Sequence, residues 1–283
     1  MSTRLPSAPA TSSASATQSP TSASTVLELD GISLVFGAVR AVENVGFRVR
    51  RHEICSVIGP NGAGKSSVLN VISGIYRPDA GSITFDGERR THMLPRVAAQ
   101  RGIARTFQNI AVFKGMSVLE NVLTGTNLSA ESHWLEQLFA VGRGRTAERR
   151  QREHAERLLE FLALEPYRHA PVGRLPYGLQ KRVELGRALA AAPKLLLLDE
   201  PMAGMNVDEK RTMSRSILDV NREIGATIVL IEHDMRVVMD LSDHVVVLDH
   251  GRVVGDGTPD EVRQNPEVLQ AYLGRRRRTP EAA

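Results

Sequence analysis

One glycine-rich stretch near residue 60 constrains the fold of this chain more than any other feature. It fits the pattern G-x-x-x-x-G-K-[ST] at every fixed position, and its residues are Gly59, Pro60, Asn61, Gly62, Ala63, Gly64, Lys65 and Ser66. Residues 53–58 before it predict a buried strand, and residues 65–73 after it predict a helix. A strand, a glycine turn and a helix in this order are typical of a phosphate-binding loop, because backbone N–H groups must close around phosphate oxygens where a Cβ would block them.

The side chains of this loop favour a nucleotide that is bound together with Mg²⁺. Lys65 supplies a point charge for the β- and γ-phosphates, and the N-terminus of the following helix adds a partial positive charge. The Ser66 hydroxyl is a candidate Mg²⁺ ligand, and the adjacent Ser67 is a candidate nucleotide contact. An accidental glycine loop is the alternative, but it leaves the strand and the helix around the match unexplained.

A pair of acidic residues follows the apolar run at 195–198. That run predicts a buried parallel strand, which ends in Asp199 and Glu200. We expect Asp199 to hold Mg²⁺ through water and Glu200 to polarise the water that attacks the γ-phosphate. Adjacent acids at a strand end often only begin a loop, but their occurrence together with a phosphate loop favours the metal site.

Composition limits what such a nucleotide site could serve. The chain has 283 residues, of which 42% are hydrophobic, so it is long and apolar enough for one large domain or two small ones. A net charge of only +4 and 4% aromatic residues do not favour a nucleic-acid groove. No apolar run approaches the roughly 20 residues that cross a bilayer, so any membrane role is expected to be peripheral. Cys55, the single cysteine, is interpreted as a core residue and indicates a reducing compartment.

The N-terminal half predicts a tail and then a small sheet. Residues 1–24 are mostly Ser, Thr, Ala and Pro, a composition that predicts disorder. Alternating apolar residues over 26–49, with a break at Gly31, and a hairpin at 82–87 predict a small antiparallel sheet. In this sheet Phe36, beside Gly37, is a candidate for stacking on adenine, although an isolated strand aromatic is more often part of the core.

The C-terminal half predicts helices and further buried strands. Residues 115–192 are expected to be helical, with a charged surface helix around 148–162. Asn206 is the expected N-cap of a helix whose apolar stripe is Met213, Ile217, Val220 and Ile224. Strands are expected at 227–231 and 245–248, and short helices at 259–264 and 266–273. His233 follows one of these strands, where a histidine alone is more often structural than catalytic.

The order of the motifs is more specific than any one of them. The phosphate loop is followed by Arg105-Thr106-Phe107-Gln108, Leu175-Pro176-Tyr177-Gly178-Leu179-Gln180, Asp199-Glu200-Pro201 and Glu232-His233-Asp234. Over residues 26–274 this order resembles the ATP-binding cassette of ABC transporters. The resemblance implies an α/β P-loop (RecA-like) ABC nucleotide-binding fold with an antiparallel β subdomain. It also implies one domain over 25–274, with a helical subdomain inserted at about 109–190, C-terminal helices at 258–274 and a basic tail at 275–283.

The resemblance also implies roles for individual residues. Phe36 is similar to the aromatic that stacks on adenine, and Gln108 to the glutamine that contacts Mg²⁺ and senses the membrane partner. Glu200 is similar to the general base and His233 to the switch histidine at the γ-phosphate. Residues 175–180 resemble the signature segment, whose members Tyr177 and Gly178 would contact ATP held by a second subunit.

Within this family the chain most resembles the larger ATPase subunit of branched-chain amino acid importers. Residues 105–109, a charged insert at about 127–165 and the ending 257–274 carry this likeness. It implies ATP and Mg²⁺ as cofactors and, as partners, a second ATPase subunit, membrane permease subunits and, indirectly, a solute-binding protein, with no nucleic acid. It also implies a peripheral place on the cytoplasmic face of the bacterial plasma membrane.

Other functions share many of these residues. Importers of urea or short amides and exporters of lipopolysaccharide have related ATPases. A soluble ABC ATPase that acts on ribosomes or DNA, and a nucleotide-binding module without catalysis, are more distant alternatives.

The signature segment departs from the usual Leu-Ser-Gly-Gly-Gln. Pro176 replaces the serine, Tyr177 a glycine and Leu179 the glutamine. Proline has neither a hydroxyl nor an N–H group, so it cannot donate to a γ-phosphate. We therefore expect a helix beginning near Gly178 to offer a weakened contact, and Asn206, where the family usually has aspartate, to remove a charge near the subunit interface. Together these departures predict an asymmetric pair of ATP sites.

Overall fold

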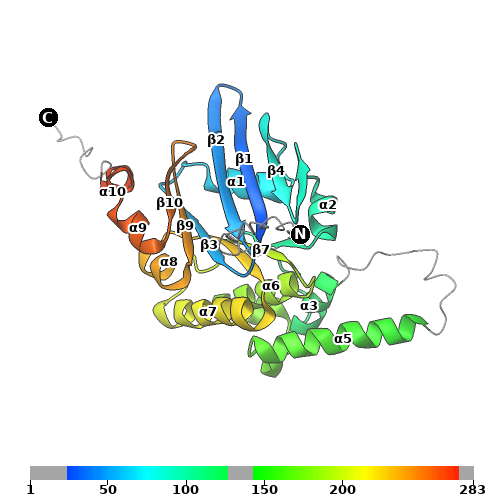
Figure 1. The fold of residues 1–283 in the computed structure, drawn as a ribbon. Coiled ribbons are helices and arrows are strands. Elements are labelled where there is room, and N and C mark those ends of the chain that lie inside the picture. Colours follow the sequence, from blue (N-terminus) through cyan, green and yellow to red (C-terminus); the bar gives the residue numbers. More distant parts are fainter. Residues whose placement is uncertain (1–23, 127–142, 274–283) are drawn as a thin grey trace, which may run out of the picture.

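The computed structural model describes residues 24–126 and 143–273 (Figure 1). Most of the tail predicted at 1–24, and the basic tail at 275–283, lie outside the described residues. Ser24 is described, and its carbonyl accepts a hydrogen bond from the Arg51 N–H at 3.0 Å. Within these ranges no helix has both the length and the apolar character that a membrane span requires.

The predicted antiparallel sheet is confirmed, with the strand order β2-β1-β4-β5. Its strands are β1 (Thr25–Phe36), β2 (Val39–Arg50), β4 (Ala80–Phe85) and β5 (Glu88–Arg90). The break expected at Gly31 is instead a bulge within β1, because the register to β2 shifts between Leu29 and Ile32 while the strand continues. Asp86 and Gly87 form the predicted hairpin turn, both with positive φ.

A second sheet of six strands has the order β10-β9-β3-β8-β7-β6. Its strands are β3 (Ile54–Ile58), β6 (Ile103–Arg105), β7 (Leu195–Asp199), β8 (Thr227–Ile231), β9 (His244–Asp249) and β10 (Arg252–Gly257). All pairs are parallel except β9 with β10, and β3, β7 and β8 are buried along their whole length, which explains their continuous apolar runs. The carboxyl ends of these three strands therefore meet at one edge, where ligands bind in open α/β sheets.

Helices pack on this sheet or extend from it. They are α1 (Lys65–Ile72), α2 (Pro95–Gln100), α3 (Val118–Thr126), α5 (Arg143–Phe161), α6 (Tyr177–Leu189), α7 (Val207–Asp219), α8 (Met235–Leu241), α9 (Pro259–Gln264) and α10 (Pro266–Leu273). Short 3₁₀ turns at Glu165–Tyr167 and Val172–Arg174 lead into α6. The helices expected at 259–264 and 266–273 are confirmed.

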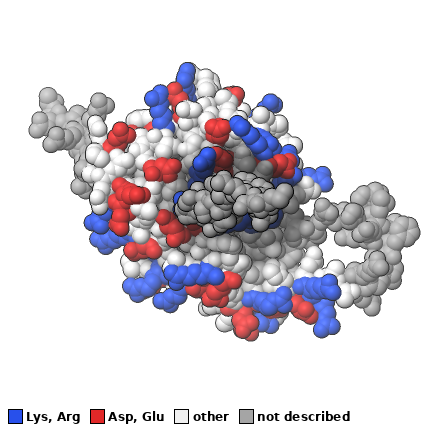
Figure 2. All heavy atoms as spheres, in the orientation of Figure 1, with Lys and Arg blue, Asp and Glu red and all other residues white. Residues whose placement is uncertain are grey.

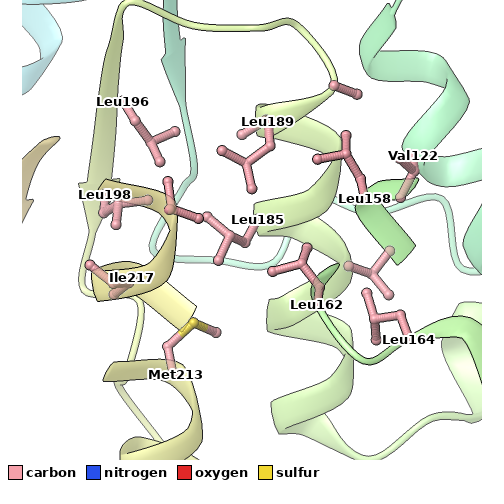
Figure 3. Packing of buried hydrophobic residues seen from close by; sticks show 14 of the residues in the cluster. Val122, Leu158, Leu162, Leu164, Leu185, Leu189, Leu196, Leu198, Met213 and Ile217 are labelled. Carbon is pink, nitrogen blue, oxygen red and sulfur yellow. The ribbon is translucent and has the colours of Figure 1, made fainter. Parts of the chain in front are cut away.

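The helices share a core with the central sheet. Figure 3 shows Leu196 and Leu198 of β7 facing Leu185 and Leu189 of α6, and α6 in turn packs on α3 and α5. On the other face of the sheet, a second cluster that includes Cys55 joins β3 to α1 and to the antiparallel sheet. Cys55 is fully buried, as expected of a core residue, and burial raises the pKa of its thiol.

Two predictions about the long helices have different outcomes. The predicted N-cap is confirmed, because Asn206 and Glu209 form a reciprocal capping box at the start of α7. The apolar stripe is confirmed for its first members, but Ile224 is 43% exposed. The reason is a π-helical turn at Val220–Ile224, which rotates the last residue away from the core.

Basic and acidic side chains are interspersed over the coloured part of the face in Figure 2. On α5, Arg149 and Glu153 form one of the expected i,i+4 pairs at 2.8 Å. The segment 127–142, part of the predicted charged insert, lies outside the described residues.

Candidate nucleotide site

The phosphate loop is built into the fold by close backbone contacts. Gly59 and Gly64 have φ of 147° and 98°, which L side chains rarely adopt. A Cβ on Gly59 would lie 2.0 Å from the Leu248 carbonyl oxygen, and one on Gly64 would lie 2.4 Å from the Ala41 carbonyl oxygen. The loop is therefore fixed between the end of β9 and strand β2, with no room for a side chain at Gly59 or Gly64.

Lys65 lies over this loop and is 6% exposed. Its Nζ donates to the Gly59 carbonyl at 2.8 Å and to the Pro60 carbonyl at 2.9 Å. Ser66 and Ser67 stand in the first turn of α1, where backbone N–H groups have no partner within the helix. Lysine charge, glycine backbone and helix N-terminus thus converge, which is the arrangement that binds phosphate.

The three residues predicted to be catalytic lie together. Glu200 follows β7, His233 follows β8, and Gln108 follows β6. One Glu200 oxygen lies 2.6 Å from His233 Nε2, and Gln108 Nε2 donates to the other at 3.0 Å. Glu200 has a φ of 49°, a strained backbone conformation of the kind found at active sites. A carboxylate held from both sides is placed to accept a proton.

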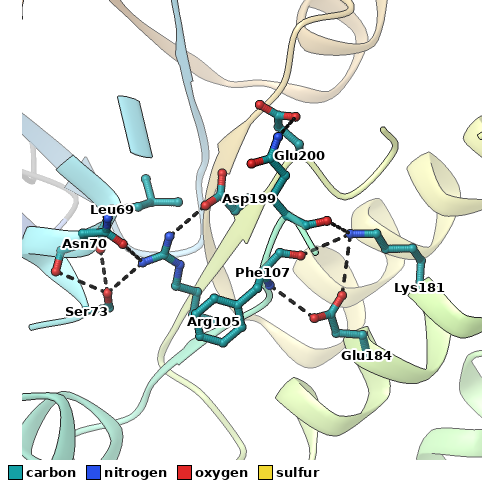
Figure 4. Close-up of polar contacts among 10 residues, drawn as sticks. Leu69, Asn70, Ser73, Arg105, Phe107, Lys181, Glu184, Asp199 and Glu200 are labelled. Carbon is teal, nitrogen blue, oxygen red and sulfur yellow. Dashed lines mark hydrogen bonds and ion pairs between the residues drawn. The ribbon is translucent and has the colours of Figure 1, made fainter. Parts of the chain in front are cut away.

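Asp199 is buried beside this group and bridges to α1 through an arginine (Figure 4). One Asp199 oxygen accepts from Arg105 at 2.7 Å, and Arg105 also donates to Asn70 at 2.6 Å and Ser73 at 3.0 Å. The other, Oδ1, is buried without a hydrogen-bond partner among the described residues. An oxygen left in this way suits a hydrated cation. The bridging role of Arg105 was not predicted from the sequence.

The donor set fits Mg²⁺. Ser66, Gln108 and Asp199 offer hydroxyl, amide and carboxylate oxygens, the ligands that this ion prefers. Within the described ranges, no group of three or more His, Cys, Asp or Glu side chains is placed to hold a metal. Mg²⁺ is typically held by one or two carboxylates together with substrate phosphates, so a sparse protein site is consistent with it.

Phe36 is on the surface. It is 45% exposed at the end of β1, and its ring meets Tyr76 edge-on at a centroid distance of 5.1 Å. The alternative to stacking, that this aromatic belongs to the core, is therefore wrong, because the hairpin of β1 and β2 extends beyond the packed sheet. Stacking on adenine remains a prediction.

Tyr177 and Gly178 lie elsewhere, at the start of α6. A Cβ on Gly178 would lie 2.7 Å from Glu209 Oε1, and the ring of Tyr177 lies beside Gly204. These neighbours belong to α7 and the loop before it. The helix begins at Tyr177, next to Gly178 as expected, and its N-cap, Pro176, gives it no side-chain cap.

Glu232 is a further residue that sequence reasoning did not single out. It is 5% exposed and accepts hydrogen bonds from the Met202 N–H at 2.9 Å and the His233 N–H at 3.2 Å. Burial raises the pKa of this carboxyl. It joins the loop after β7 to the residue that contacts Glu200. The sequence signal that could have indicated Glu232 is its position directly after the buried strand β8.

Comparison with known families agrees with this geometry. A family model described as "ABC transporter" matches residues 42–203, and one described as "Branched-chain amino acid ATP-binding cassette transporter" matches residues 252–277. The chain is 40% identical to the high-affinity branched-chain amino acid transport ATP-binding protein BraF of Pseudomonas aeruginosa, over 88% of this chain and 98% of that protein. It is 35% identical to LivG of Escherichia coli over the same shares.

Solved structures give the same result. A nucleotide-free ATP-binding cassette from an ABC transporter superposes with a TM-score of 0.77 at 31% identity, covering 88% of this chain and 99% of that one. A cassette in its ADP conformation gives a TM-score of 0.76 at 32% identity, covering 89% and 99%. From its fold, its phosphate loop and these relatives, the chain belongs to the ABC transporter family, as one of its ATP-hydrolysing cassettes.

Proposed function

We propose that this chain is the ATPase subunit of an importer for branched-chain amino acids. The observation that carries the catalytic part is the contact of Glu200 with both His233 and Gln108, at the sheet edge where the loop that contains Lys65 also begins. The solute class is supported by the C-terminal match at 252–277 and by relatives that are named for transport of these amino acids.

In the proposed reaction each residue acts on a different part of ATP. Lys65 and the loop N–H groups bind the β- and γ-phosphates, and Phe36 stacks on the adenine. Ser66, Gln108 and Asp199 would hold Mg²⁺, which neutralises phosphate charge when bound. Glu200 accepts the proton of the attacking water, while His233, 2.6 Å away, orients its carboxylate.

The proposed partners follow from surfaces on two sides of the site. The signature residue Tyr177 is 42% exposed at the start of α6, so it is available to ATP held by a second ATPase subunit, whereas Gly178 beside it is buried against Glu209. Phe107, Phe113 and Met116 are 39%, 51% and 41% exposed around the loop that carries Gln108. Exposed apolar side chains in one loop suit a partner surface, which we assign to the permease subunits. The chain would then lie peripherally on the cytoplasmic face of the inner membrane.

Other family functions are less well supported. The relatives named above favour amino acids over urea, short amides or lipopolysaccharide. Glu200 and His233 together argue against a nucleotide-binding module without catalysis. Co-purification of a multi-spanning membrane protein would further separate a transporter subunit from a factor that acts on ribosomes or DNA.

Radiolabelled uptake tests the proposal. A strain lacking this protein should lose uptake of leucine, isoleucine and valine and keep uptake of urea and acetamide. Wild-type protein should restore leucine uptake, and the matched variant Glu200→Gln should not. Normal leucine uptake together with a collapse of urea uptake would overturn the substrate assignment.

A further inference from the structure

Three charged residues on one face of α6 contact the loop that carries Gln108. Lys181, Glu184 and Arg187 are spaced three residues apart, so they lie along the same side of the helix. Their partners are backbone groups of residues 107–111, a segment far away in the sequence. Nothing in the phosphate chemistry described above uses these three side chains.

The contacts pair with both N–H donors and carbonyl acceptors of the loop backbone. Glu184 Oε1 accepts the N–H groups of Phe107 at 3.3 Å and Ala111 at 3.2 Å. Lys181 Nζ donates to the carbonyls of Phe107 at 3.2 Å and Gln108 at 3.0 Å. Arg187 donates to the Ala111 carbonyl. Figure 4 shows Lys181 and Glu184 pointing together at Phe107.

Lys181 and Glu184 form a buried pair, so loss of these hydrogen bonds would strongly destabilise the fold. The side chains of Lys181 and Glu184 are 2% and 1% exposed, and their charged atoms lie 3.7 Å apart. Charges removed from water are tolerated only where an opposite charge and hydrogen bonds replace the lost solvation. The loop backbone supplies hydrogen bonds to Lys181 Nζ and Glu184 Oε1, whereas Glu184 Oε2 is buried without a hydrogen-bond partner among the described residues and faces the Lys181 charge. The loop is therefore attached firmly to α6.

The loop and helix α6, which these contacts join, each carry residues of the proposed nucleotide sites. The side chain of Gln108 donates to Glu200, and the N-terminus of α6 carries Tyr177 and Gly178. A rigid helix links the two ends, since Lys181 lies one turn after Tyr177.

We propose that Lys181 and Glu184 are positioning residues that join the loop of Gln108 to the signature end of α6. Movement of Gln108 at Glu200 and movement of the signature are then one event. This inference rests on the proposed function, because it takes the site to bind ATP.

Hydrogen exchange on the isolated chain tests the inference. A non-hydrolysable ATP analogue with Mg²⁺ is the probe, and its binding is measured separately by equilibrium dialysis. In the wild type, the analogue should change the exchange of residues 107–111 and 176–180 together. The double variant Lys181→Met/Glu184→Met removes both charges and leaves neither unpaired. In it, the Phe107 and Ala111 amides should exchange roughly tenfold faster, and residues 176–180 should lose their response.

Arg182→Met is the matched control. Arg182 is the neighbour of Lys181 on the same helix, but it donates to the Leu162 carbonyl instead of the loop. This variant should keep the joint response, and Lys181→Arg should keep it as well. A response at 176–180 that survives in the double variant would overturn the inference.

The wild-type experiment needs no variant, so it can overturn the inference even if the double variant does not fold. Binding of the analogue with a response confined to 107–111 would overturn this inference alone. No binding of the analogue would overturn the proposed function, and this inference with it.

Discussion

The phosphate loop and the signature segment belong to one nucleotide-binding fold but are built in opposite ways. The loop is enclosed: Lys65 is buried, and the backbone at Gly59 and Gly64 touches neighbouring strands. The signature segment is open at Tyr177, which is 42% exposed, and Pro176, the N-cap of α6, provides no side-chain cap. The loop can therefore hold phosphate with groups of this chain only, whereas the signature segment lacks a ligand until another surface meets it.

This difference predicts which substitutions affect the isolated chain and which affect only an assembly of two ATPase subunits. Substitutions in the loop should affect the isolated chain. Substitutions in the signature should be nearly silent until a second ATPase subunit is present.

The largest effect on the isolated chain is expected from Lys65→Ala. The variant removes the cation of the loop, and hydrogen bonds to charged groups are worth roughly 1.5–3 kcal/mol each, so ATP affinity should fall at least about a hundredfold. Equilibrium nucleotide binding to the isolated chain measures this. Lys194→Ala, at the opposite end of β7, is the control and should bind normally. Unchanged affinity of Lys65→Ala would mean that Lys65 is not at the phosphates.

Glu200→Gln should separate binding from turnover. A neutral amide cannot accept the proton from water, so phosphate release should fall by roughly 10²- to 10⁴-fold while ATP binding is retained. Phosphate release in the assembled transporter is the measurement. A rate near that of the wild type would assign the base to another residue.

Two glycines of the loop provide a matched pair. Gly64→Ala should impair both folding stability and nucleotide binding, because its Cβ would lie 2.4 Å from the Ala41 carbonyl oxygen. At Gly62 a Cβ meets nothing within 4 Å, so Gly62→Ala should cost only the strain of a positive φ, about 1–2 kcal/mol. Thermal denaturation and nucleotide titration compare the two. Equal losses would contradict the close contact between the loop and β2.

The smallest effect is expected from Pro176→Ser. A serine N-cap stabilises a helix by about 1 kcal/mol, so the variant should melt at a slightly higher temperature. In the assembled transporter the new hydroxyl should raise ATP affinity at the site completed by this signature, by up to about tenfold. Pro176→Ala, which removes the ring without adding a hydroxyl, is the control. If ATPase rate and affinity are the same in both variants, the asymmetry hypothesis should be abandoned.

The sequence predicted features whose chemistry is local in the chain. The phosphate loop, the acids after β7 and the capping box of Asn206 each depend on residues a few positions apart, so spacing alone indicates them. The buried strands were equally clear, because their apolar runs are continuous.

Features that depend on distant partners could not be predicted in this way. Strand β6 has only Ile103–Arg105, and its pairing with Leu195–Leu197 defines it as a strand. The attachment of loop 107–111 to α6 also joins separate segments. The exposure of Phe36 was open too, because alternation along a strand does not tell where the strand leaves the packed sheet.

The burial of Cys55 has a practical consequence for labelling. This thiol is the only one in the chain, it is fully enclosed, and its raised pKa disfavours the reactive thiolate. The native protein should therefore be nearly inert to maleimide dyes. A cysteine introduced at the exposed position Tyr177 would then be the single site that a fluorophore labels. The emission of this fluorophore would report the approach of a second ATPase subunit, and Cys55 would not have to be removed first.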